Sequence, residues 1–157
     1  SQVRSILLKK NLPNKLNEFS ISSNFIGALE VRVYPAGFPY NTTAYCLQII
    51  NDEGFSVFHE GHVVNKKVIQ NNDIKADIAI LTAEEVKFFG LLTLSMSLKN
   101  TMIACNLLEA KKLFITGSNP LKNTGFINHF LKLNKLDNDV IDDKIKIFYE
   151  AGTSYSS

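Results

Sequence analysis

The sequence has no tryptophan, only two cysteines and only three histidines among its 157 residues. It also lacks any run of 18 consecutive apolar residues, and no basic segment followed by an apolar stretch stands at its beginning. We therefore expect neither a membrane-spanning helix nor a retained secretory signal peptide.

The sequence also has little excess of positive over negative charge. The formal net charge is +2, and the lysine pairs Lys9-Lys10, Lys66-Lys67 and Lys111-Lys112 are scattered along the chain. A dedicated nucleic-acid-binding protein would normally be more basic, with its basic residues more clustered. We expect neither a nucleic acid nor a membrane as a partner.

Hydrophobic residues are plentiful by comparison: they make up 45% of the chain against 20% charged residues, and 11 of them are phenylalanine. A chain of this length buries about 70% of its unfolded surface on folding. The composition therefore excludes a disordered tail. With no internal repeat and no linker, the sequence predicts a single domain over residues 1–157.

The two cysteines lie inside apolar runs, Cys46 in residues 44–50 and Cys105 in residues 102–108. Buried cysteine behaves as a small hydrophobic residue. We therefore expect two buried thiols in a reducing, cytoplasmic compartment rather than a disulfide or a metal pair.

Three segments in the first half alternate apolar and polar residues, as half-buried strands do. They are residues 29–35, 44–50 and 55–60, and Asn51-Asp52-Glu53-Gly54 is typical of a hairpin turn between the last two. The sequence predicts an antiparallel meander after a strand or loop lead-in over residues 1–26.

The second half mixes strands with helices. Residues 77–81 and 113–116 are short apolar runs, typical of interior strands covered on both faces, and residues 144–150 are expected to form a last strand. We predict helices from Thr82 to a break near Lys99-Asn100, over residues 101–110 and over residues 124–132. The predicted fold class is α/β (α+β), with a mixed β-sheet and helices on one face.

The second face of such a sheet has no obvious cover. The chain has little left for another layer beyond residues 1–25, and an under-covered sheet face is usually buried against a partner.

Five short patterns in chain order carry a resemblance to a known fold. They are Val31-Arg32-Val33-Tyr34-Pro35-Ala36, residues 55–61 with His62, Ala76-Asp77-Ile78-Ala79-Ile80-Leu81, residues 111–119 and residues 147–155. Together, residues 27–157 resemble the C-terminal half of the metallo-β-lactamase fold, particularly the ascorbate-phosphate-lactonase-like hydrolases. The resemblance implies half of a four-layer αββα sandwich.

The departures from that family concern its metal site. The family's His-x-His-x-Asp-His loop is absent, and its ligand positions correspond here to Phe38, His62 and Ser118. A two-metal hydrolytic site typically needs four or five histidines with one or two aspartates, and three histidines cannot supply them. We therefore expect no metal cofactor and, for this chain alone, no enzyme activity.

The remaining candidate residues give weak signals. His59-Glu60-Gly61-His62 lacks the His-Glu-x-x-His spacing, so His59 and His62 are weak metal candidates, expected as an exposed pair at a strand end. Ser118 lacks the surroundings of a nucleophile elbow, and His129 is expected at a polar helix position. Residues 38–40 form either a recognition surface or, as we favour, a plug over the former metal site.

Two functional hypotheses follow. The first is a non-catalytic metallo-β-lactamase-like domain that acts through protein association, with its bare sheet face buried in a homodimer or against a separate protein. The alternative is a hydrolase dependent on zinc or another divalent metal, whose site is completed by another chain or by a missing N-terminal half, with His62 as a contributor. An unrelated α/β domain would be favoured if residues 44–60 formed no hairpin beside a mixed sheet.

Overall fold

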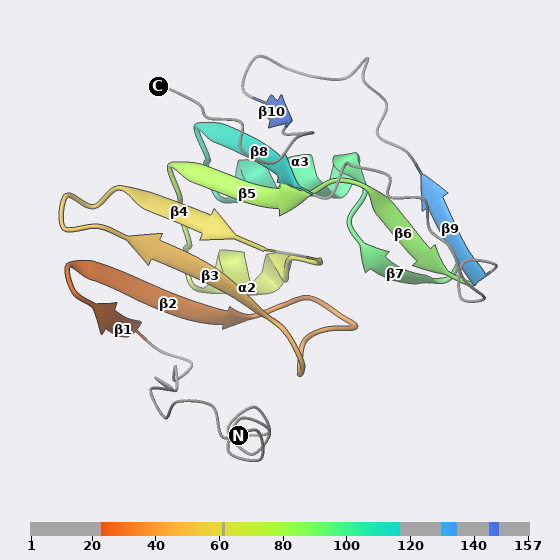
Figure 1. The fold of residues 1–157 in the computed structure, drawn as a ribbon, viewed down its shortest axis with the longest axis horizontal. Coiled ribbons are helices and arrows are strands. Elements are labelled where there is room, and N and C mark those ends of the chain that lie inside the picture. Colours follow the sequence, from red (N-terminus) through yellow and green to blue (C-terminus); the bar gives the residue numbers. More distant parts are fainter. Residues whose placement is uncertain (1–22, 61, 117–129, 135–144, 148–157) are drawn as a thin grey trace, which may run out of the picture.

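The computed structural model describes residues 23–60, 62–116, 130–134 and 145–147, which form two sheets and two helices (Figure 1). The main sheet has seven strands: β1 (Ser23–Ile26), β2 (Leu29–Pro35), β3 (Tyr45–Ile50), β4 (Ser56–His59), β5 (Ile78–Thr82), β8 (Lys112–Thr116) and β10 (Ile145–Ile147). None of the described helices is long and apolar enough to cross a membrane.

The strands of the main sheet lie in the order β1-β2-β3-β4-β5-β8-β10. The first four form an antiparallel meander, and β4, β5, β8 and β10 run parallel to one another. At the predicted hairpin turn, Gly54 has a φ of 82°, and the side chain of Asn51 accepts a hydrogen bond from the Phe55 amide at 2.8 Å. The predicted meander and mixed sheet are therefore confirmed.

Both described helices pack on the same side of the main sheet (Figure 1). They are α2 (Lys66–Asn71) and α3 (Leu98–Leu107), and the side chains of Asn65 and Ser97 cap their N-termini. Because Ser97 supplies the cap, α3 begins three residues before the predicted start at residue 101. The sequence patterns did not predict α2, which is only six residues long.

The helix predicted from Thr82 to a break near Lys99-Asn100 is wrong over residues 82–95. This segment forms a hairpin of β6 (Glu85–Phe88) and β7 (Leu92–Ser95), which joins β9 (Leu131–Asn134) in a second sheet. Phe89 and Gly90 at the turn have φ values of 51° and 70°, and positive φ at both central residues is typical of a tight hairpin turn. Pairing with β9 therefore overrides the local helical pattern.

The last predicted elements are described only in part. The helix predicted over residues 124–132 is wrong at its end, because Leu131 and Lys132 are extended and belong to strand β9. Strand β10 confirms the core of the strand predicted over residues 144–150. Residues 1–22 and 124–129 lie outside the described residues.

Successive side chains of a strand point to opposite faces, so the register of the main sheet separates its side chains into two sets. One set packs against the helices and is buried; we call it the helix face, and it comprises Cys46, Phe58, Ala79, Leu81, Leu113 and Ile115.

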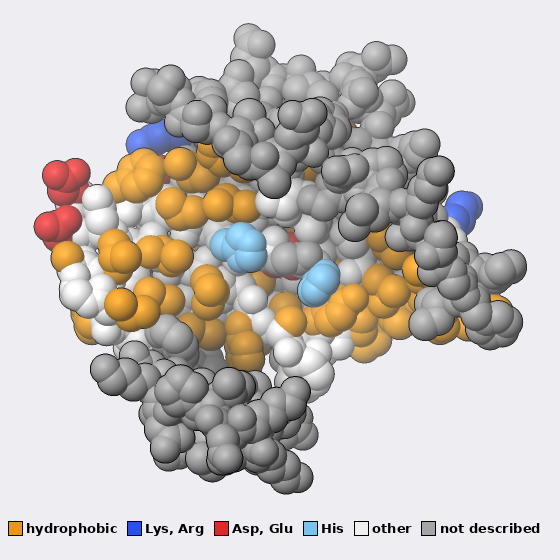
Figure 2. Space-filling model, in the orientation of Figure 1, with side chains coloured by type: hydrophobic (Ala, Val, Ile, Leu, Met, Phe, Trp, Pro, Cys, Tyr) orange, Lys and Arg blue, Asp and Glu red, His pale blue; other side chains and the backbone are white. Residues whose placement is uncertain are grey.

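The other set forms two rows across five neighbouring strands, on which no described helix lies. We call these rows the open face: Val33, Leu47, His59, Ile80 and Phe114 in the first, and Val31, Ile49, Val57, Ile78 and Lys112 in the second. Figure 2 shows the molecule from this side, with histidine side chains among apolar ones. Val31 and Val33 are buried, while the other members are half-buried or exposed.

Candidate functional site

The C-terminal ends of β2, β4, β5 and β8 lie at one edge of the main sheet, because these strands run in the same direction. The residues that follow them include Phe38, Tyr40, Glu60 and His62. Together with His59 we call these residues the strand-end site. Ser118, which follows β8, and His129 lie outside the described residues.

Glu60 is the most unusual residue of this site, because its carboxyl group is buried with the residue only 1% exposed. One carboxyl oxygen accepts a hydrogen bond from the His62 amide, and the other has no hydrogen-bond partner among the described residues. Burial raises the pKa of Glu60 to about 8, although the Val63 amide opposes this shift. Glu60 therefore holds a proton at neutral pH.

His62 is fixed by contacts around it. Its carbonyl oxygen accepts hydrogen bonds from the Met96 amide at 3.2 Å and the Thr82 hydroxyl at 3.1 Å. Its ring stacks on Tyr40, with the ring centroids 4.7 Å apart. His62 is nevertheless exposed, with one face of its ring packed against Tyr40.

The loop that carries Phe38 is clamped to the segment after β4. The Gly37 amide donates to the Val63 carbonyl at 2.7 Å, and a Cβ atom at Gly37 would lie 2.7 Å from a Val63 methyl group. Glycine is therefore needed at this close approach. Phe38 itself is 73% exposed, whereas Tyr40 is half-buried against His62, so the interpretation of residues 38–40 as a plug stays a prediction.

The metal donors of the described residues do not fit the two-metal centre that the resemblance implies. Within residues 23–60, 62–116, 130–134 and 145–147, no three His, Cys, Asp or Glu side chains gather where they could hold a metal ion. His59 and His62 are both exposed. A dinuclear site needs several such donors around each ion, so the described residues do not supply the ligands of such a centre.

Cys46 lies near Glu60 in the core. Burial raises the pKa of its thiol to about 12, and the neighbouring Glu60 carboxyl adds to the shift. Cys46 and Cys105 are both buried and no disulfide joins them, which confirms the predicted buried thiols. A thiol with so high a pKa is not a nucleophile at neutral pH.

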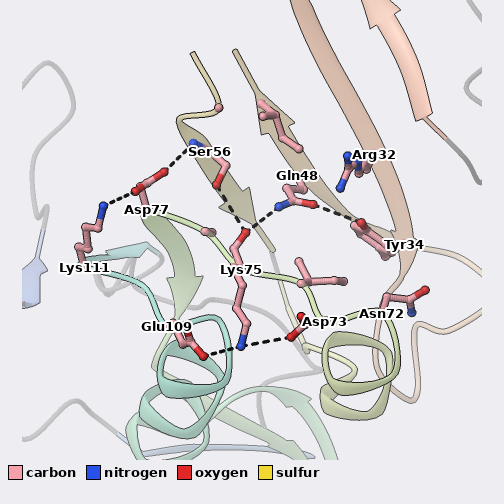
Figure 3. Close-up of a pocket in the computed structure, with 14 residues that line it drawn as sticks. Arg32, Tyr34, Gln48, Ser56, Asn72, Asp73, Lys75, Asp77, Glu109 and Lys111 are labelled. Atoms are coloured by element: carbon pink, nitrogen blue, oxygen red, sulfur yellow. Dashed lines mark hydrogen bonds and ion pairs between the residues drawn. The ribbon is translucent and has the colours of Figure 1, made fainter. Parts of the chain in front are cut away.

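A cavity of about 420 Å³ lies at the opposite edge of the sheet (Figure 3). The Tyr34 hydroxyl donates to the Gln48 side chain at 3.2 Å, and the Gln48 amide donates to the Lys75 carbonyl at 2.7 Å. The Lys75 ammonium group in turn pairs with Glu109 and Asp73, at 2.5 Å and 3.3 Å. These polar groups of the cavity are thus bonded to one another.

Asp77 anchors the other side of this cavity. Its carboxylate accepts hydrogen bonds from the Ser56 amide at 2.9 Å and the Lys111 ammonium group at 2.7 Å, and Lys111 lowers the pKa of Asp77. The network joins the starts of β4, β5 and β8. We interpret this hydrogen-bond and ion-pair network as one that stabilises the fold. The sequence patterns did not predict it, because its members are far apart in the chain.

Three solved structures of known proteins have a similar fold. Igni18, a metallo hydrolase from the archaeon Ignicoccus hospitalis, matches with a TM-score of 0.61 and 11% identity, over 94% of this chain and 63% of its own. A diphosphatase of the PhnP family matches with a TM-score of 0.60 and 12% identity, over 95% of this chain and 52% of its own.

The third is YhfI from Bacillus subtilis, a metallo-β-lactamase fold protein, with a TM-score of 0.50 and 14% identity over 64% of this chain and 40% of its own. This chain has the metallo-β-lactamase fold. At these identities the likeness concerns the fold alone, and no protein-family model or curated protein sequence matches the chain. The closer likeness to ascorbate-phosphate lactonases stays a prediction.

This chain spans about half the length of the solved structures that it resembles.

The sequence patterns located the strand-end site at Phe38, His59 and His62, but they did not single out Glu60. The signal that could have found it is its position directly after β4, where alternation places it on the helix face.

Proposed function

We propose that this chain is a non-catalytic domain of the metallo-β-lactamase fold, which acts by pairing its open face with the open face of a second copy. The observation that carries the proposal is the apolar character of both faces of the main sheet. A sheet of this kind is the inner layer of a sandwich, because each apolar face has to be buried against another layer.

The composition of the open face supports the pairing. Eight of its ten side chains are apolar, and the other two are His59 and Lys112. Leu47, Ile49 and Ile80 are only half-buried, although the same residue types on the helix face are fully enclosed. Burying this area against another apolar surface is favourable by about 25 cal/mol per Å².

A second copy fits this surface for two reasons. Each copy contributes one sheet with helices on its outer side, so two copies placed face to face restore the four-layer αββα arrangement. The open face contains no carboxylate and a single lysine, so a two-fold pairing brings few like charges together. We further propose that pairing takes place in the cytoplasm, the compartment that suits the buried thiols.

Light scattering after size-exclusion chromatography tests the proposal. Ile80→Asp places a carboxylate in the first row of the open face and should convert a dimer into a monomer. The matched control Phe89→Asn removes a side chain that is 60% exposed on the second sheet, and it should leave the mass unchanged. A wild-type chain that stays monomeric at about 100 μM, far above the dissociation constant of a stable complex, would contradict the proposal.

Glu60 favours a second candidate, in which the chain contributes to a metal-dependent hydrolase completed by residues from elsewhere. One of its carboxyl oxygens is buried at the strand-end site close to His62 and has no partner among the described residues. Metal analysis of the purified protein by mass spectrometry separates the two candidates. Stoichiometric zinc, iron or manganese would favour the hydrolase and contradict the non-catalytic domain, whereas a metal-free dimer would contradict the hydrolase.

A further inference from the structure

We infer that the turn between β6 and β7 inserts into the surface of a membrane that contains anionic lipids. The segment is Phe88-Phe89-Gly90-Leu91-Leu92, which we call the hairpin tip. It lies in the second sheet, outside the open face, so the inference does not depend on the proposed pairing. The sequence patterns did not suggest a membrane because they predicted a helix here, and a hairpin that inserts shallowly needs no long apolar run.

The hairpin tip exposes apolar side chains at the end of the second sheet that lies away from the main sheet (Figure 1). Phe89 is 60% exposed, and Leu91 is 88% exposed, more than any other large hydrophobic residue that the structure describes. The Phe89 ring packs against the rings of Phe88 and Phe130, with centroids 4.5 Å and 4.8 Å apart. The exposed ring therefore belongs to a packed aromatic cluster.

The backbone of the turn would suit a different residue at position 89. Phe89 and Gly90 have φ values of 51° and 70°, and two such residues in a hairpin turn are most often Asn-Gly. A bulky side chain in the left-handed region is strained. Strained residues are found mainly where a function retains them, so Phe89 indicates a role for its exposed ring other than folding.

Polarity changes in a fixed order along the hairpin. Lys87 of β6 lies two residues before Phe89 and directly opposite the exposed Lys132 of β9. Two residues of a strand span roughly 7 Å, which matches the depth of about 5–10 Å to which interfacial segments insert. Glu85, which pairs with Lys87 at 3.1 Å, lies two residues further from the tip. Apolar tip, lysines and carboxylate thus follow the order of acyl chains, lipid phosphates and water.

An anionic membrane fits this surface better than a protein partner does. The hairpin tip is a single narrow turn, whereas a stable protein interface buries about 1,200–2,000 Å² in total. Like charges directly opposite on neighbouring strands repel each other, and lipid phosphates would relieve the repulsion between Lys87 and Lys132. The cytoplasmic leaflet, which faces the compartment proposed above, is anionic, and each lysine near it strengthens binding by about 5-fold.

Flotation with lipid vesicles tests the inference. The probes are vesicles of phosphatidylcholine alone and of phosphatidylcholine mixed about 2:1 with phosphatidylglycerol. The wild-type chain should float with the anionic vesicles, and its partition coefficient should be at least about 5-fold lower on the neutral ones. Leu91→Asn should lower binding to the anionic vesicles by at least about 10-fold. The matched control Phe25→Asn removes a side chain of β1 that is 75% exposed, and it should leave binding unchanged.

Lys132→Gln separates the contribution of charge from that of the apolar tip. It should lower the partition coefficient on anionic vesicles by about 5-fold and leave that on neutral vesicles unchanged. Far-ultraviolet circular dichroism shows that each variant stays folded.

A fluorescent reporter locates the contact by a second measurement. The chain has no tryptophan, so Leu91→Trp and Phe25→Trp each introduce a single indole. On anionic vesicles the emission of Leu91→Trp should shift to shorter wavelength, and brominated lipid should quench it. The emission of Phe25→Trp should stay unchanged.

The outcomes also distinguish this inference from the proposed function. A wild-type chain that floats with neither kind of vesicle overturns the inference, as does an equal loss of binding in Leu91→Asn and Phe25→Asn. Equal binding to neutral and anionic vesicles overturns the part assigned to the lysines. A chain that floats as expected but stays monomeric contradicts the proposed pairing and supports the insertion of the hairpin tip.

Discussion

The two faces of the main sheet use similar residues in different surroundings. Ile80 and Leu81 are neighbours in β5, yet Ile80 is half-buried on the open face and Leu81 is 0% exposed against the helices. At the end of β4, His59 is exposed on the open face while Glu60 is buried on the other. The helix face is therefore completed within the chain, and the open face has the composition of an interior without a described layer to cover it.

Under the proposed pairing, folding and association depend on different faces of the same sheet. Substitutions on the helix face should act on the free energy of unfolding, because the contacts there are made within one chain. Substitutions on the open face should act on the dissociation constant of the proposed dimer instead.

The largest expected effect comes from the ionisable group on the helix face. Burial holds the pKa of Glu60 at about 8, against 4.5 for an exposed glutamate, so the folded chain keeps a proton that the unfolded chain loses between these values. The free energy of unfolding should fall as the pH rises through this range, by up to about 5 kcal/mol, since each pKa unit corresponds to about 1.4 kcal/mol. Below pH 4.5 this loss is absent.

Glu60→Gln keeps the shape of the side chain and removes its ionisation. Urea unfolding from pH 5 to 9 should give a flatter profile for this variant than for the wild type, with the variant more stable at the alkaline end. Two parallel profiles would contradict the presence of a buried, protonated carboxyl group.

The second-largest effect is the difference in unfolding free energy between substitutions of Leu81 and Ile80, which are neighbours in β5. Leu81→Ala leaves a cavity in the helix-face core and should lower the free energy of unfolding by about 3 kcal/mol. Ile80→Ala should cost about 1 kcal/mol when measured at low protein concentration, where pairing contributes least. Urea unfolding of both variants provides the comparison, and equal losses would mean that the two faces are equally enclosed within one chain.

A smaller effect is expected at the opposite edge of the sheet. Asp77→Asn weakens the contact with Lys111 and should cost about 1 kcal/mol at pH 7, in keeping with exposed ion pairs. Because Lys111 lowers the pKa of Asp77, this contribution is present above the ordinary carboxyl pKa and is lost as the pH falls through the lowered value. Thermal unfolding of both chains at pH 7 and pH 2.5 measures it, and a difference that persists in acid would contradict the ion pair.

The smallest effect is a gain in stability. Phe89 has a φ of 51°, in the left-handed region that asparagine tolerates better than phenylalanine, and Gly90 follows it. Phe89→Asn should raise the free energy of unfolding by about 0.5 kcal/mol without changing the mass in solution. A lower midpoint in urea would show that the packing of Phe89 against Phe88 and Phe130 outweighs the backbone strain.

The main sheet was predictable because its strands carry their own signals. Period-2 alternation marked β2, β3 and β4, and continuous apolar runs marked β5 and β8. The hairpin of β6 and β7 was not predictable in this way, since Val86 through Leu92 also matches the spacing of a helix face. Its structure depends on pairing with β9, about 40 residues further along the chain, a distance beyond any local pattern.

The strand-end site was predictable only in outline. A family pattern placed Phe38 and His62 near each other, and the clamp between Gly37 and Val63 explains why they meet. The Glu60 amide donates to the Ile80 carbonyl of β5 at 3.0 Å, and its carboxyl group lies near Tyr40 of the loop after β2 and Cys46 of β3. Such an enclosure is a property of the packed fold, so the pKa of Glu60 could not be read from its neighbours in the chain.

The pairing of two open faces is tested most directly by nuclear Overhauser effects between copies, in a mixture of methyl-labelled and unlabelled chains at pH 7.5. We predict intermolecular effects at the methyl groups of Leu47, Ile49 and Ile80, with none at Leu81 or Leu113. Intermolecular effects confined to other surfaces, or their absence at concentrations where the chain is folded, would contradict the pairing.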